Sequence, residues 1–499
     1  MSTDPSRARL NRSTSIDARG MEEPEHRRYA FPERILQFGT GAFLRGFTNV
    51  YFDRAIRACR FRGRIVVVGS TRSGRSAQFN AQEGLYTVCV QGMHDGEVVD
   101  RCSVVGSVSR AIDATAHWQN VLEVARSPQI EFVVSNTTEV GIRLDPDDRR
   151  DLDPPNTFPG KLTALLQERA EALAYHPERG LTILCCELIE DNAQTLRSIV
   201  LELIERWSLG TALTDWVGTH NRFCNTLVDR IVPGRPDASK MRELEVRLGY
   251  ADELLVQAEP YSFWAIEGSD ALRERLPFAG GEAGVVVTPD ISAYRTRKVR
   301  LLNGAHTAMV PVALLCGLDT VQEAMNDRMI SAYVHRILFQ EIVPTLEAPG
   351  AEDFAREVID RFANPFVRHE LLSIALQQSM KMNVRVVPSI EAYARRTGRL
   401  PEGLTLGFTA FLHLVTGGGR AGGAGPTDLS ADDLADVVRS HWRSSGPARL
   451  DAFVRAVCAD RTLWHVPLDD LPGFVLAVSS ELRDFRETGI RASLQSLLH

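Results

Sequence analysis

The segment that most constrains the fold of this 499-residue chain is residues 34–47, R-I-L-Q-F-G-T-G-A-F-L-R-G-F. A short, largely apolar run typical of a buried strand leads into a glycine turn and the start of a helix. Gly39 permits a tight turn, and Gly41 lets an anionic group such as a pyrophosphate approach the backbone at the helix start. Leu44 takes the place of the third glycine in the dinucleotide-binding pattern, so the segment alone is also typical of a plain structural turn.

Further apolar runs follow this segment and alternate with helical stretches. The runs are predicted to be strands at residues 65–69, 131–135 and 181–186, and the stretches are predicted to be helices at residues 161–174 and 193–207. Continuous apolar strands between helices are typical of a parallel sheet that is covered on both faces. Ligands of such sheets bind at the carboxyl ends of the strands, where this chain has Asn136, Thr137 and Asn192. Each of the three is also a common helix-cap or turn residue.

The character of the chain changes near residue 290, where the strand-like runs end. Helices are predicted at residues 321–339, 355–362, 370–380, 406–415 and 431–442, and a glycine-rich surface loop at residues 416–425. We therefore predict an α/β N-terminal Rossmann-like domain with a mostly parallel sheet over residues 31–288. An all-α C-terminal domain is predicted over residues 289–499. Residues 1–30 are polar and aperiodic, which predicts a disordered leader.

The stretch K-V-R-L-L-N-G-A-H at residues 298–306 carries the strongest chemical signal of the predicted helical domain. On an α-helix, Lys298, Asn303 and His306 fall within an arc of about 140°, on a side away from the aliphatic residues. A lysine, an amide and an imidazole can together move a proton, hold a developing oxyanion and orient a hydroxyl. The alternative is an amphipathic helix with a solvated polar side. Pro311 is expected to kink or end this helix.

Composition narrows the classes of function. The net charge is −7 and the pI is near 6, so neither nucleic acid nor an anionic membrane is indicated as a partner. No apolar run approaches the roughly 20 residues of a membrane span. The eight cysteines and twelve histidines show no metal-ligand spacing. These patterns favour a metal-independent cytoplasmic protein with reduced, buried thiols, and they leave the oligomeric state open between monomer and dimer.

Three motifs together point to a family. Residues 39–47 read G-T-G-A-F-L-R-G-F, residues 82–87 read Q-E-G-L-Y-T, and residues 298–306 read K-V-R-L-L-N-G-A-H. They resemble the G-x-G-x-F-x-R, Q-D-G-L-Y-T and K-x-x-x-x-N-x-x-H signatures of the polyol-specific long-chain dehydrogenases and reductases. This is the family of mannitol 2-dehydrogenase and the hexuronate reductases, and the resemblance extends from residue 32 to the C-terminus.

The resemblance implies NAD-dependent hydride transfer between nicotinamide and a secondary alcohol or ketone. It implies that Lys298 is the general acid and base and that Asn303, together with Asn192, holds the carbonyl oxygen. It also implies that His306 binds a substrate hydroxyl. Further residues that match the family's site are Asp229 and Lys381 for the substrate, and Gly39, Gly41, Phe43, Arg45, Asn136 and Thr137 for the cofactor.

The substrate that the resemblance implies is an anionic sugar. Three further stretches resemble the hexuronate-reducing members: V-S-N-T-T-E at residues 134–139, C-E-L-I-E-D-N at 186–192 and N-P-F-V-R-H-E-L-L-S-I-A at 364–375. The implied reaction is reduction of tagaturonate to altronate, with fructuronate reduction and mannitol oxidation left open. Ser373 stands where mannitol-oxidising members have an arginine, and Arg295 where they have an acid. We expect Arg295 to bind the substrate carboxylate, unless it pairs with a nearby acid such as Asp290.

The expected cofactor is NAD, with NADP left open. NAD-specific sheets carry an acid after the second strand that binds the ribose hydroxyls, whereas residues 69–75 read G-S-T-R-S-G-R. Arg72 and Arg75 could accommodate a 2′-phosphate, and the alternative is a solvated loop. A hypothesis of a different class is a dinucleotide-binding sensor or a non-redox isomerase. The intact lysine, amides and histidine favour an enzyme that transfers hydride.

Overall fold

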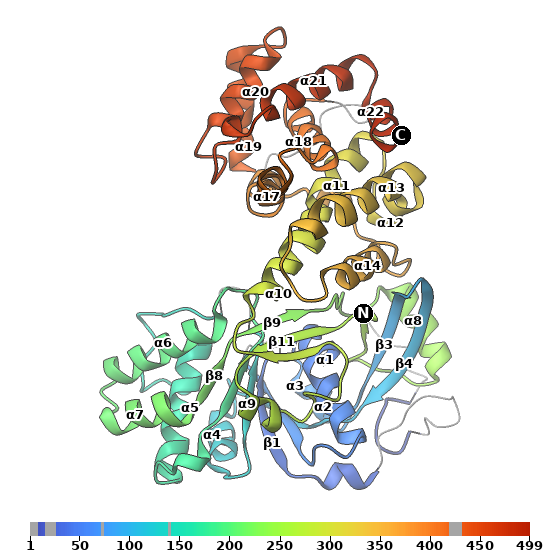
Figure 1. The fold of residues 1–499 in the computed structure, drawn as a ribbon. Helices are drawn as coiled ribbons and strands as arrows, with labels where there is room; N and C mark the ends of the chain where they lie inside the picture. The colour runs from blue at the N-terminus through green and yellow to red at the C-terminus, as the bar shows by residue number, and fades with distance from the viewer. Residues whose placement is uncertain (1–7, 15–25, 71–73, 138–140, 419–431) are drawn as a thin grey trace. The chain divides into compact units, whose positions relative to one another are not determined.

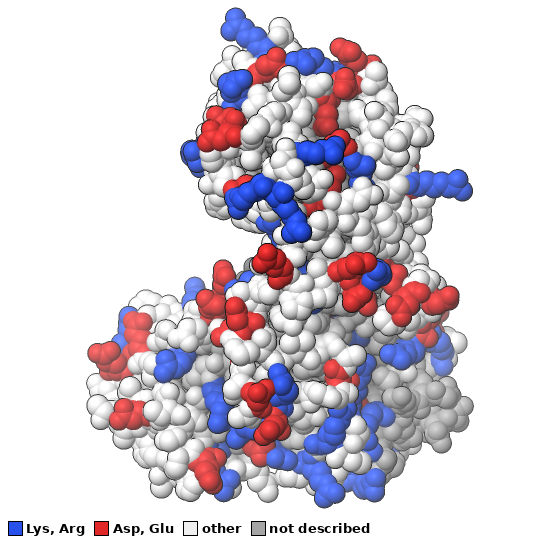
Figure 2. Space-filling view, in the orientation of Figure 1, with Lys and Arg blue, Asp and Glu red and all other residues white. Residues whose placement is uncertain are grey.

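The structure is a computed structural model that describes residues 8–14, 26–70, 74–137, 141–418 and 432–499. The chain forms two compact units (Figure 1). Unit 1 comprises Met1–Gln91 and Val99–Ile291, and unit 2 comprises Gly92–Val98 and Ser292–His499. On the face shown in Figure 2, basic and acidic side chains are interspersed over each unit. No helix within the described ranges combines the length and the apolar character needed to cross a membrane.

A parallel sheet forms the centre of unit 1. Its order among the described residues is β5-β2-β1-β6-β7-β8, and each neighbouring pair is parallel. The strands are β1 (Glu33–Phe38), β2 (Arg64–Gly69), β5 (Val108–Asp113), β6 (Phe132–Ser135), β7 (Thr182–Cys185) and β8 (Arg222–Cys224). β2, β6 and β7 are buried along their whole length. This continuous burial explains why their sequences are unbroken apolar runs.

Helices cover both faces of this sheet, and each face has its own apolar core. Because side chains alternate along a strand, Ile35 of β1 packs into one core and Leu36 into the other. The helices of unit 1 are α1 (Ala42–Gly46), α2 (Thr48–Arg57), α3 (Ser76–Ala81), α4 (Trp118–Arg126), α5 (Phe158–Ala172), α6 (Asn192–Arg206), α7 (Thr211–His220), α8 (Ala238–Leu248) and α9 (Asp270–Arg275), with 3-10 turns at His26–Ala30 and Pro177–Arg179.

Two three-stranded sheets complete the strands of the described residues. One has the order β10-β3-β4 and consists of β3 (Tyr86–His94), β4 (Glu97–Val105) and β10 (Val256–Ala258). The other has the order β12-β11-β9 and consists of β9 (Thr226–Asp229), β11 (Phe263–Glu267) and β12 (Val285–Thr288). The tip of the β3–β4 hairpin, Gly92–Val98, belongs to unit 2.

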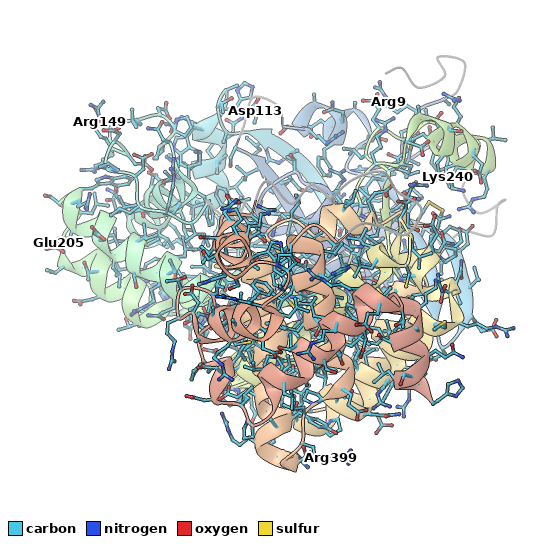
Figure 3. The ribbon with its side chains drawn as sticks, turned by 90° about the horizontal axis from the view of Figure 1, so that it is seen from above. Arg9, Asp113, Arg149, Glu205, Lys240 and Arg399 are labelled. Atoms are coloured by element: carbon cyan, nitrogen blue, oxygen red, sulfur yellow. A yellow bond between two sulfur atoms is a disulfide. The ribbon has the colours of Figure 1, made fainter. Side chains whose placement is uncertain are left out.

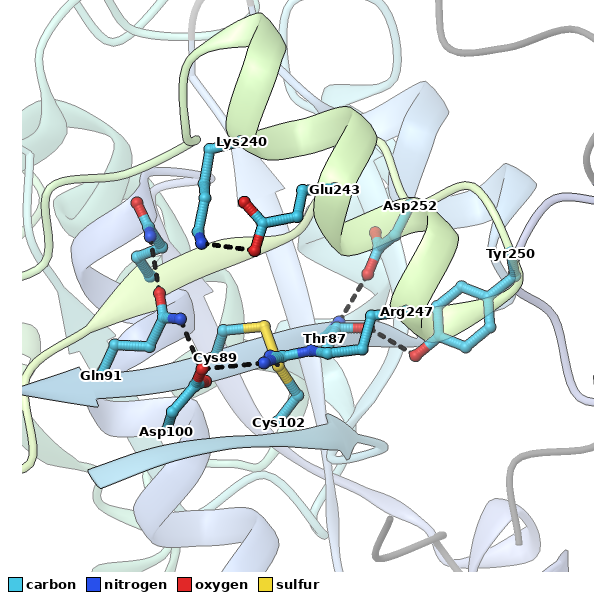
Figure 4. Close-up of a disulfide and its surroundings, with 11 residues drawn as sticks. Thr87, Cys89, Gln91, Asp100, Cys102, Lys240, Glu243, Arg247, Tyr250 and Asp252 are labelled. Carbon is cyan, nitrogen blue, oxygen red and sulfur yellow. Dashed lines mark hydrogen bonds and ion pairs between the residues drawn. A yellow bond between two sulfur atoms is a disulfide. The ribbon is translucent and has the colours of Figure 1, made fainter. Parts of the chain in front are cut away.

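A disulfide joins β3 and β4 between Cys89 and Cys102 (Figure 4). Arg247 of α8 donates to Cys102 Sγ at 2.7 Å and pairs with Asp100 at 2.9 Å. The expectation of uniformly reduced thiols is therefore wrong for this pair, because pairing of the two strands brings both cysteines together. The other six cysteines are free, and of these Cys59 is exposed.

Part of the predicted leader is ordered. Leu10 is fully buried, and its N–H donates to the carbonyl of Ala251 at 2.9 Å. Arg9, labelled in Figure 3, pairs with Glu253 at 2.9 Å. The prediction of a disordered leader is wrong for residues 8–14, because one apolar side chain anchors this polar segment in a core. Residues 1–7 and 15–25 lie outside the described residues.

Within the described ranges, unit 2 consists of helices, their connections and the hairpin tip. Its α-helices are α10 (Ser292–Arg297), α11 (Gly304–Leu315), α12 (Val321–Asn326), α13 (Arg328–Arg336), α14 (Ala351–Phe362), α15 (Leu371–Ile374), α16 (Gln378–Lys381), α17 (Val387–Thr397), α18 (Glu402–Val415), α19 (Asp433–Ser445), α20 (Leu450–Ala459), α21 (Phe474–Glu487) and α22 (Ile490–Leu498). Three segments are π-helices: η4 (Lys298–Asn303), η5 (Ile337–Ile342) and η7 (Met382–Val386). Two are 3-10 turns: η6 (Val343–Thr345) and η8 (Leu468–Asp470). The predicted fold class is confirmed, with the hairpin tip as the exception to an all-α second unit.

Three predicted features of unit 2 differ in the structure. The helix predicted at residues 370–380 is divided into α15 and α16, because the chain turns between them and Gln377 has a φ of +53°. The helix predicted at residues 321–339 is interrupted at Asp327, whose extended backbone and carboxylate cap the start of α13. Pro311 does not end its helix, since α11 continues to Leu315. Proline lacks the N–H that would bond to the carbonyl of Thr307, and Gln378 Nε2 donates to that carbonyl instead, at 2.8 Å. Most of the predicted glycine-rich loop, residues 419–431, lies outside the described residues.

Candidate active site

A cavity of about 700 Å³ lies at the carboxyl ends of β1 and β6 in unit 1. The strand order reverses between these two strands, which is where open parallel sheets bind ligands. Phe38 of β1 pairs with Ser135 of β6, so the residues that follow the two strands become neighbours. The cavity is lined by residues 39–43, Ser70, Asn136, Thr137, Gly141, Arg143, residues 156–158 and Lys161.

The two glycines of the first turn have different roles. Gly39 has a φ of +124°, and a Cβ there would lie 3.0 Å from the carbonyl oxygen of Asn136. Gly39 is therefore required by its positive φ and by the close approach of Asn136, the residue that follows β6. Gly41 lines the cavity, and nothing lies within 4 Å of the place where its Cβ would be. This open approach to the backbone fits the pyrophosphate of a dinucleotide.

The other residues predicted for the nucleotide turn lie on opposite sides of it. Phe43 lines the cavity and stacks on Phe47, with ring centroids 4.9 Å apart. Arg45 is 2% exposed, and its guanidinium donates to the carbonyl of Thr40 at 2.5 Å. Burial lowers the pKa of Arg45 to about 10. Arg45 thus stabilises the turn through this hydrogen bond, and it does not line the cavity.

A buried carboxylate organises the opposite wall of the cavity. Glu187 accepts hydrogen bonds from the Thr137 N–H at 3.0 Å, from the Thr137 hydroxyl at 3.2 Å and from the Ser135 hydroxyl at 3.1 Å. Asn136 Nδ2 donates to the carbonyl of Cys186 at 2.5 Å. Burial raises the pKa of Glu187, although these donors oppose the shift. No role for Glu187 was predicted, because a lone acid after a strand carries no distinctive pattern.

Lys161 is a second residue that the sequence analysis missed. It lies in the first turns of α5, lines the cavity and is 3% exposed. Its ammonium donates to the carbonyl of Asn156 at 2.7 Å, and burial lowers its pKa to about 8. A cation near a helix N-terminus is unfavourable with the macrodipole, which was the available signal. A phosphate in the cavity would offset that cost.

The loop after β2 is described only in part. Arg72 lies outside the described residues, and the backbone N–H of Arg75 approaches the hydroxyl of Thr40 at 3.5 Å. Ser70 lines the cavity. The preference between NAD and NADP therefore stays a prediction.

Asn192 and Asp229 are the other predicted site residues of unit 1. The Asn192 Nδ2 donates to the carbonyls of Cys185, Glu187 and Thr226 at 3.0, 3.0 and 3.1 Å. Its Oδ1 accepts from the N–H groups of Ala193 and Thr226 at 2.8 and 3.2 Å. The whole amide thus fastens the end of β7 to the start of β9. Asp229 is buried at the end of β9, opposite Phe263 of β11.

The predicted catalytic stretch of unit 2 is not a plain α-helix. Residues 298–303 form η4, a π-helix that continues directly into α11. In an α-helix, residues five apart are separated by about 140°. In a π-helix the i→i+5 hydrogen bond places them one above the other. The insertion therefore brings Lys298 and Asn303 to one side of the helix, and His306 follows on the next turn.

His306 lies in a basic, aromatic environment. Its ring stacks on Phe362 with centroids 3.9 Å apart and meets the ring of His369 edge-on at 5.4 Å. Burial lowers the pKa of His306 well below its usual value, and His369, Arg361, Arg385 and Lys381 lower it further. Its Nε2 is buried without a hydrogen-bond partner among the described residues. A neutral imidazole with a free nitrogen can bind a substrate hydroxyl.

The cations around the start of η4 do not act as one cluster. Arg297 donates to the carbonyl of Pro349 at 2.6 Å, and Arg300 donates to that of Pro388 at 2.6 Å. Both arginines therefore hold the helix in place. Arg295 is half-buried in α10, and the Lys381 ammonium donates to the carbonyl of Ile374 at 2.8 Å. Among the described residues, no three His, Cys, Asp or Glu side chains are grouped to hold a metal ion.

The Q-E-G-L-Y-T motif is part of the scaffold of unit 1. Gln82 donates to Asp252 at 2.8 Å. The same carboxylate accepts the Thr87 N–H at 2.6 Å, a contact that Figure 4 shows. Gly84 has a φ of +82°, and a Cβ there would lie 2.2 Å from the carbonyl oxygen of Val108. These contacts show that the residues of the motif stabilise the fold of unit 1, and they account for the motif without a ligand.

Comparison with known proteins covers both units. Residues 33–280 match the mannitol dehydrogenase Rossmann domain, and residues 290–485 match the mannitol dehydrogenase C-terminal domain. The chain is 38% identical to the altronate oxidoreductase of Bacillus subtilis (strain 168) over 467 residues, which are 93% of this chain and 95% of that protein. It is also 38% identical to the altronate oxidoreductase of Klebsiella pneumoniae (strain 342) over 472 residues, 94% and 97% of the two chains.

A solved structure shares the fold. The mannitol 2-dehydrogenase of Pseudomonas fluorescens, in a ternary complex with NAD and D-mannitol, matches with a TM-score of 0.67. The match covers 98% of this chain and 99% of that chain at 24% sequence identity.

Proposed function

This chain belongs to the mannitol dehydrogenase family, as its motifs predicted, and we propose that it reduces tagaturonate to altronate with NADH. The observation that carries the proposal is the lysine, amide and imidazole on successive turns of η4 and α11. The full-length relatives named altronate oxidoreductase support the choice of substrate. A cytoplasmic location is part of the same proposal, because the reaction consumes NADH.

Three residues of unit 2 would handle the substrate. When bound, the nicotinamide supplies the hydride that the ketone carbon accepts. As the hydride reaches the carbon, the carbonyl π pair moves onto oxygen, and the Lys298 ammonium gives that oxygen a proton. The Asn303 amide donates a hydrogen bond to the oxygen while its charge develops. His306 accepts or donates a hydrogen bond at a neighbouring hydroxyl. Altronate oxidation runs through the same steps in reverse, with neutral Lys298 as the base.

The cavity of unit 1 would hold the dinucleotide. Gly41 offers unobstructed backbone to the pyrophosphate, and Lys161 offers a buried positive charge. Phe43, Asn136 and Thr137 would contact the remainder of the cofactor. Arg45 would contribute by keeping the turn in shape, through its bond to Thr40.

The test is a panel of ketone substrates followed by the absorbance of NADH. Tagaturonate, fructuronate and fructose are compared with and without a metal chelator, and NADPH replaces NADH in a parallel series. We expect tagaturonate to have the highest catalytic efficiency and the chelator to have no effect. A higher efficiency on fructose, or activity that the chelator abolishes and zinc restores, would contradict the proposal.

A further inference from the structure

A half-buried arginine of unit 2, Arg385 on η7, makes no hydrogen bond or ion pair with any residue that the structure describes. The arginines at the start of the catalytic helix differ, since Arg297 and Arg300 each donate to a backbone carbonyl. A guanidinium carries five N–H donors, and groups removed from water normally find acceptors. The side chain of Arg385 is half-buried, and its guanidinium keeps some contact with solvent and has no acceptor among the described residues.

The place of Arg385 connects it with the candidate active site. Its backbone carbonyl oxygen lies 3.0 Å from where a Cβ at Gly304 would be, so η7 packs directly against the first turn of α11. Gly304 follows Asn303 and precedes His306 by two residues. The charge of Arg385 acts on both His306 and Lys381, which places its guanidinium near the two predicted substrate-binding side chains.

Negative charge is scarce around this group. Burial lowers the pKa of Arg385, and no described carboxylate opposes the shift. Asp432 acts on Lys381, but its carboxylate already accepts the N–H groups of Ser379 and Ala435 at 2.8 and 3.2 Å. Arg368, a second basic candidate in this region, is exposed and pairs with Glu370 at 2.5 Å. Of Arg385, Lys381 and Arg368, only Arg385 has no described carboxylate acting on it.

We propose that Arg385 binds the carboxylate of the sugar-acid substrate. The inference rests on the proposed function and names the group that selects a ketohexuronate over a neutral ketohexose. A planar guanidinium can donate two parallel hydrogen bonds to a carboxylate, a geometry that lysine cannot reproduce. Arg385 takes the role that was expected of Arg295. Ser373 is consistent with this assignment, because its hydroxyl donates to the carbonyl of Glu370 and adds no charge.

The experiment compares Arg385→Gln and Arg385→Lys with the unaltered enzyme, and Arg295→Gln serves as the matched control for the rival arginine. Two quantities are measured. The first is the ratio of kcat/KM for tagaturonate to kcat/KM for the neutral ketohexose of the same hydroxyl configuration. The second is the affinity for altronate in the presence of NADH, by calorimetry, which needs no turnover. Circular dichroism checks that each variant is folded.

We expect Arg385→Gln to lower both the selectivity ratio and the altronate affinity by roughly 10- to 100-fold, the range for a lost charge-assisted hydrogen bond. Arg385→Lys should recover part of the loss, and Arg295→Gln should change the ratio little. Undiminished altronate binding by Arg385→Gln, or a selective loss confined to Arg295→Gln, would overturn the inference alone. An unaltered enzyme that neither reduces tagaturonate nor binds altronate would overturn the proposed function and the inference with it.

Discussion

The two asparagines predicted to hold the carbonyl oxygen should respond differently to replacement by alanine. Asn192→Ala is expected to cost mainly stability, whereas Asn303→Ala is expected to cost turnover. The reason is the state of each amide in the structure. Both N–H donors of Asn192 are directed at backbone carbonyls of unit 1. The side-chain amide of Asn303 has no hydrogen-bond partner among the described residues, so it can donate to a substrate oxygen.

The cost of Asn192→Ala follows from the bonds that it removes. Five hydrogen bonds are lost, but two of the partner groups have another partner. The Cys185 carbonyl also accepts from the Thr226 hydroxyl, and the Ala193 N–H also donates to Asn225. The other three buried partner groups are left without a described hydrogen bond, at a cost of about 1 to 1.5 kcal/mol each. The free energy of unfolding should fall by about 3 to 4.5 kcal/mol.

The cost of Asn303→Ala falls on the transition state. Removal of one oxyanion donor typically lowers kcat by about 100- to 1,000-fold, or roughly 3 to 4 kcal/mol. Because no described hydrogen bond of the folded state involves this side chain, the free energy of unfolding should change by less than about 1 kcal/mol.

Urea unfolding followed by tryptophan fluorescence and NADH consumption with tagaturonate measure the two effects. Asn221→Ala is a matched control, since this buried asparagine also bonds to backbone groups, through the N–H of Leu181 and the carbonyl of Trp216. It should lose stability and keep its turnover per folded molecule. An Asn192→Ala enzyme that unfolds like the unaltered chain and turns over 100-fold more slowly would refute the reasoning, because its amide would then act on the substrate.

Four further predictions concern charged or titratable side chains. Lys298→Ala should lower kcat by roughly 100- to 10,000-fold and leave NADH binding, measured by fluorescence, nearly unchanged. Affinity for NADH should fall as the pH rises through about 8, where Lys161 loses its proton, and Lys161→Gln should abolish this dependence in binding titrations. Replacing Arg72 and Arg75 together with alanine should weaken NADPH binding more than NADH binding if the loop holds a 2′-phosphate; equal effects would mean a solvated loop. Burial raises the pKa of Glu481 from 4.5 to about 8, so the folded chain keeps a proton that the unfolded chain releases. Stability should fall as the pH rises from about 4.5 to about 8, and Glu481→Gln should flatten that fall in pH-dependent unfolding.

The parallel sheet could be predicted because its signals are local. An unbroken apolar run such as residues 65–69 needs burial on both faces, and a parallel sheet between two helical layers supplies it. Features set by contacts between distant segments were not predictable in the same way. Nothing near Leu10 indicates that it fills a core beside Ala251, and the pairing of Cys89 with Cys102 depends on how two strands align.

The candidate site shows where motif reading stops. The motif named Lys298, Asn303 and His306, because proton transfer and oxyanion binding need those residue types. It could not reveal the π-helical turn that aligns the first two, since the i→i+5 pattern is a property of the backbone. Nor could the motif show whether a side-chain amide is already hydrogen-bonded within the protein, because that depends on backbone carbonyls far along the chain.

The choice of the arginine that binds the substrate carboxylate shows the same limit of the sequence. Arg295, Arg297 and Arg300 surround Lys298 in the sequence, and Arg295 was the one expected to bind the substrate carboxylate. Hydrogen bonding removes two of them, because Arg297 and Arg300 donate to the carbonyls of Pro349 and Pro388. Packing then introduces a cation from 80 residues away, because the missing side chain of Gly304 lets the Arg385 backbone reach the catalytic helix. In the proposed assignment, the arginine that selects the substrate reaches the catalytic helix because Gly304 has no side chain, and Gly304→Ala should weaken selection of the sugar acid by displacing η7.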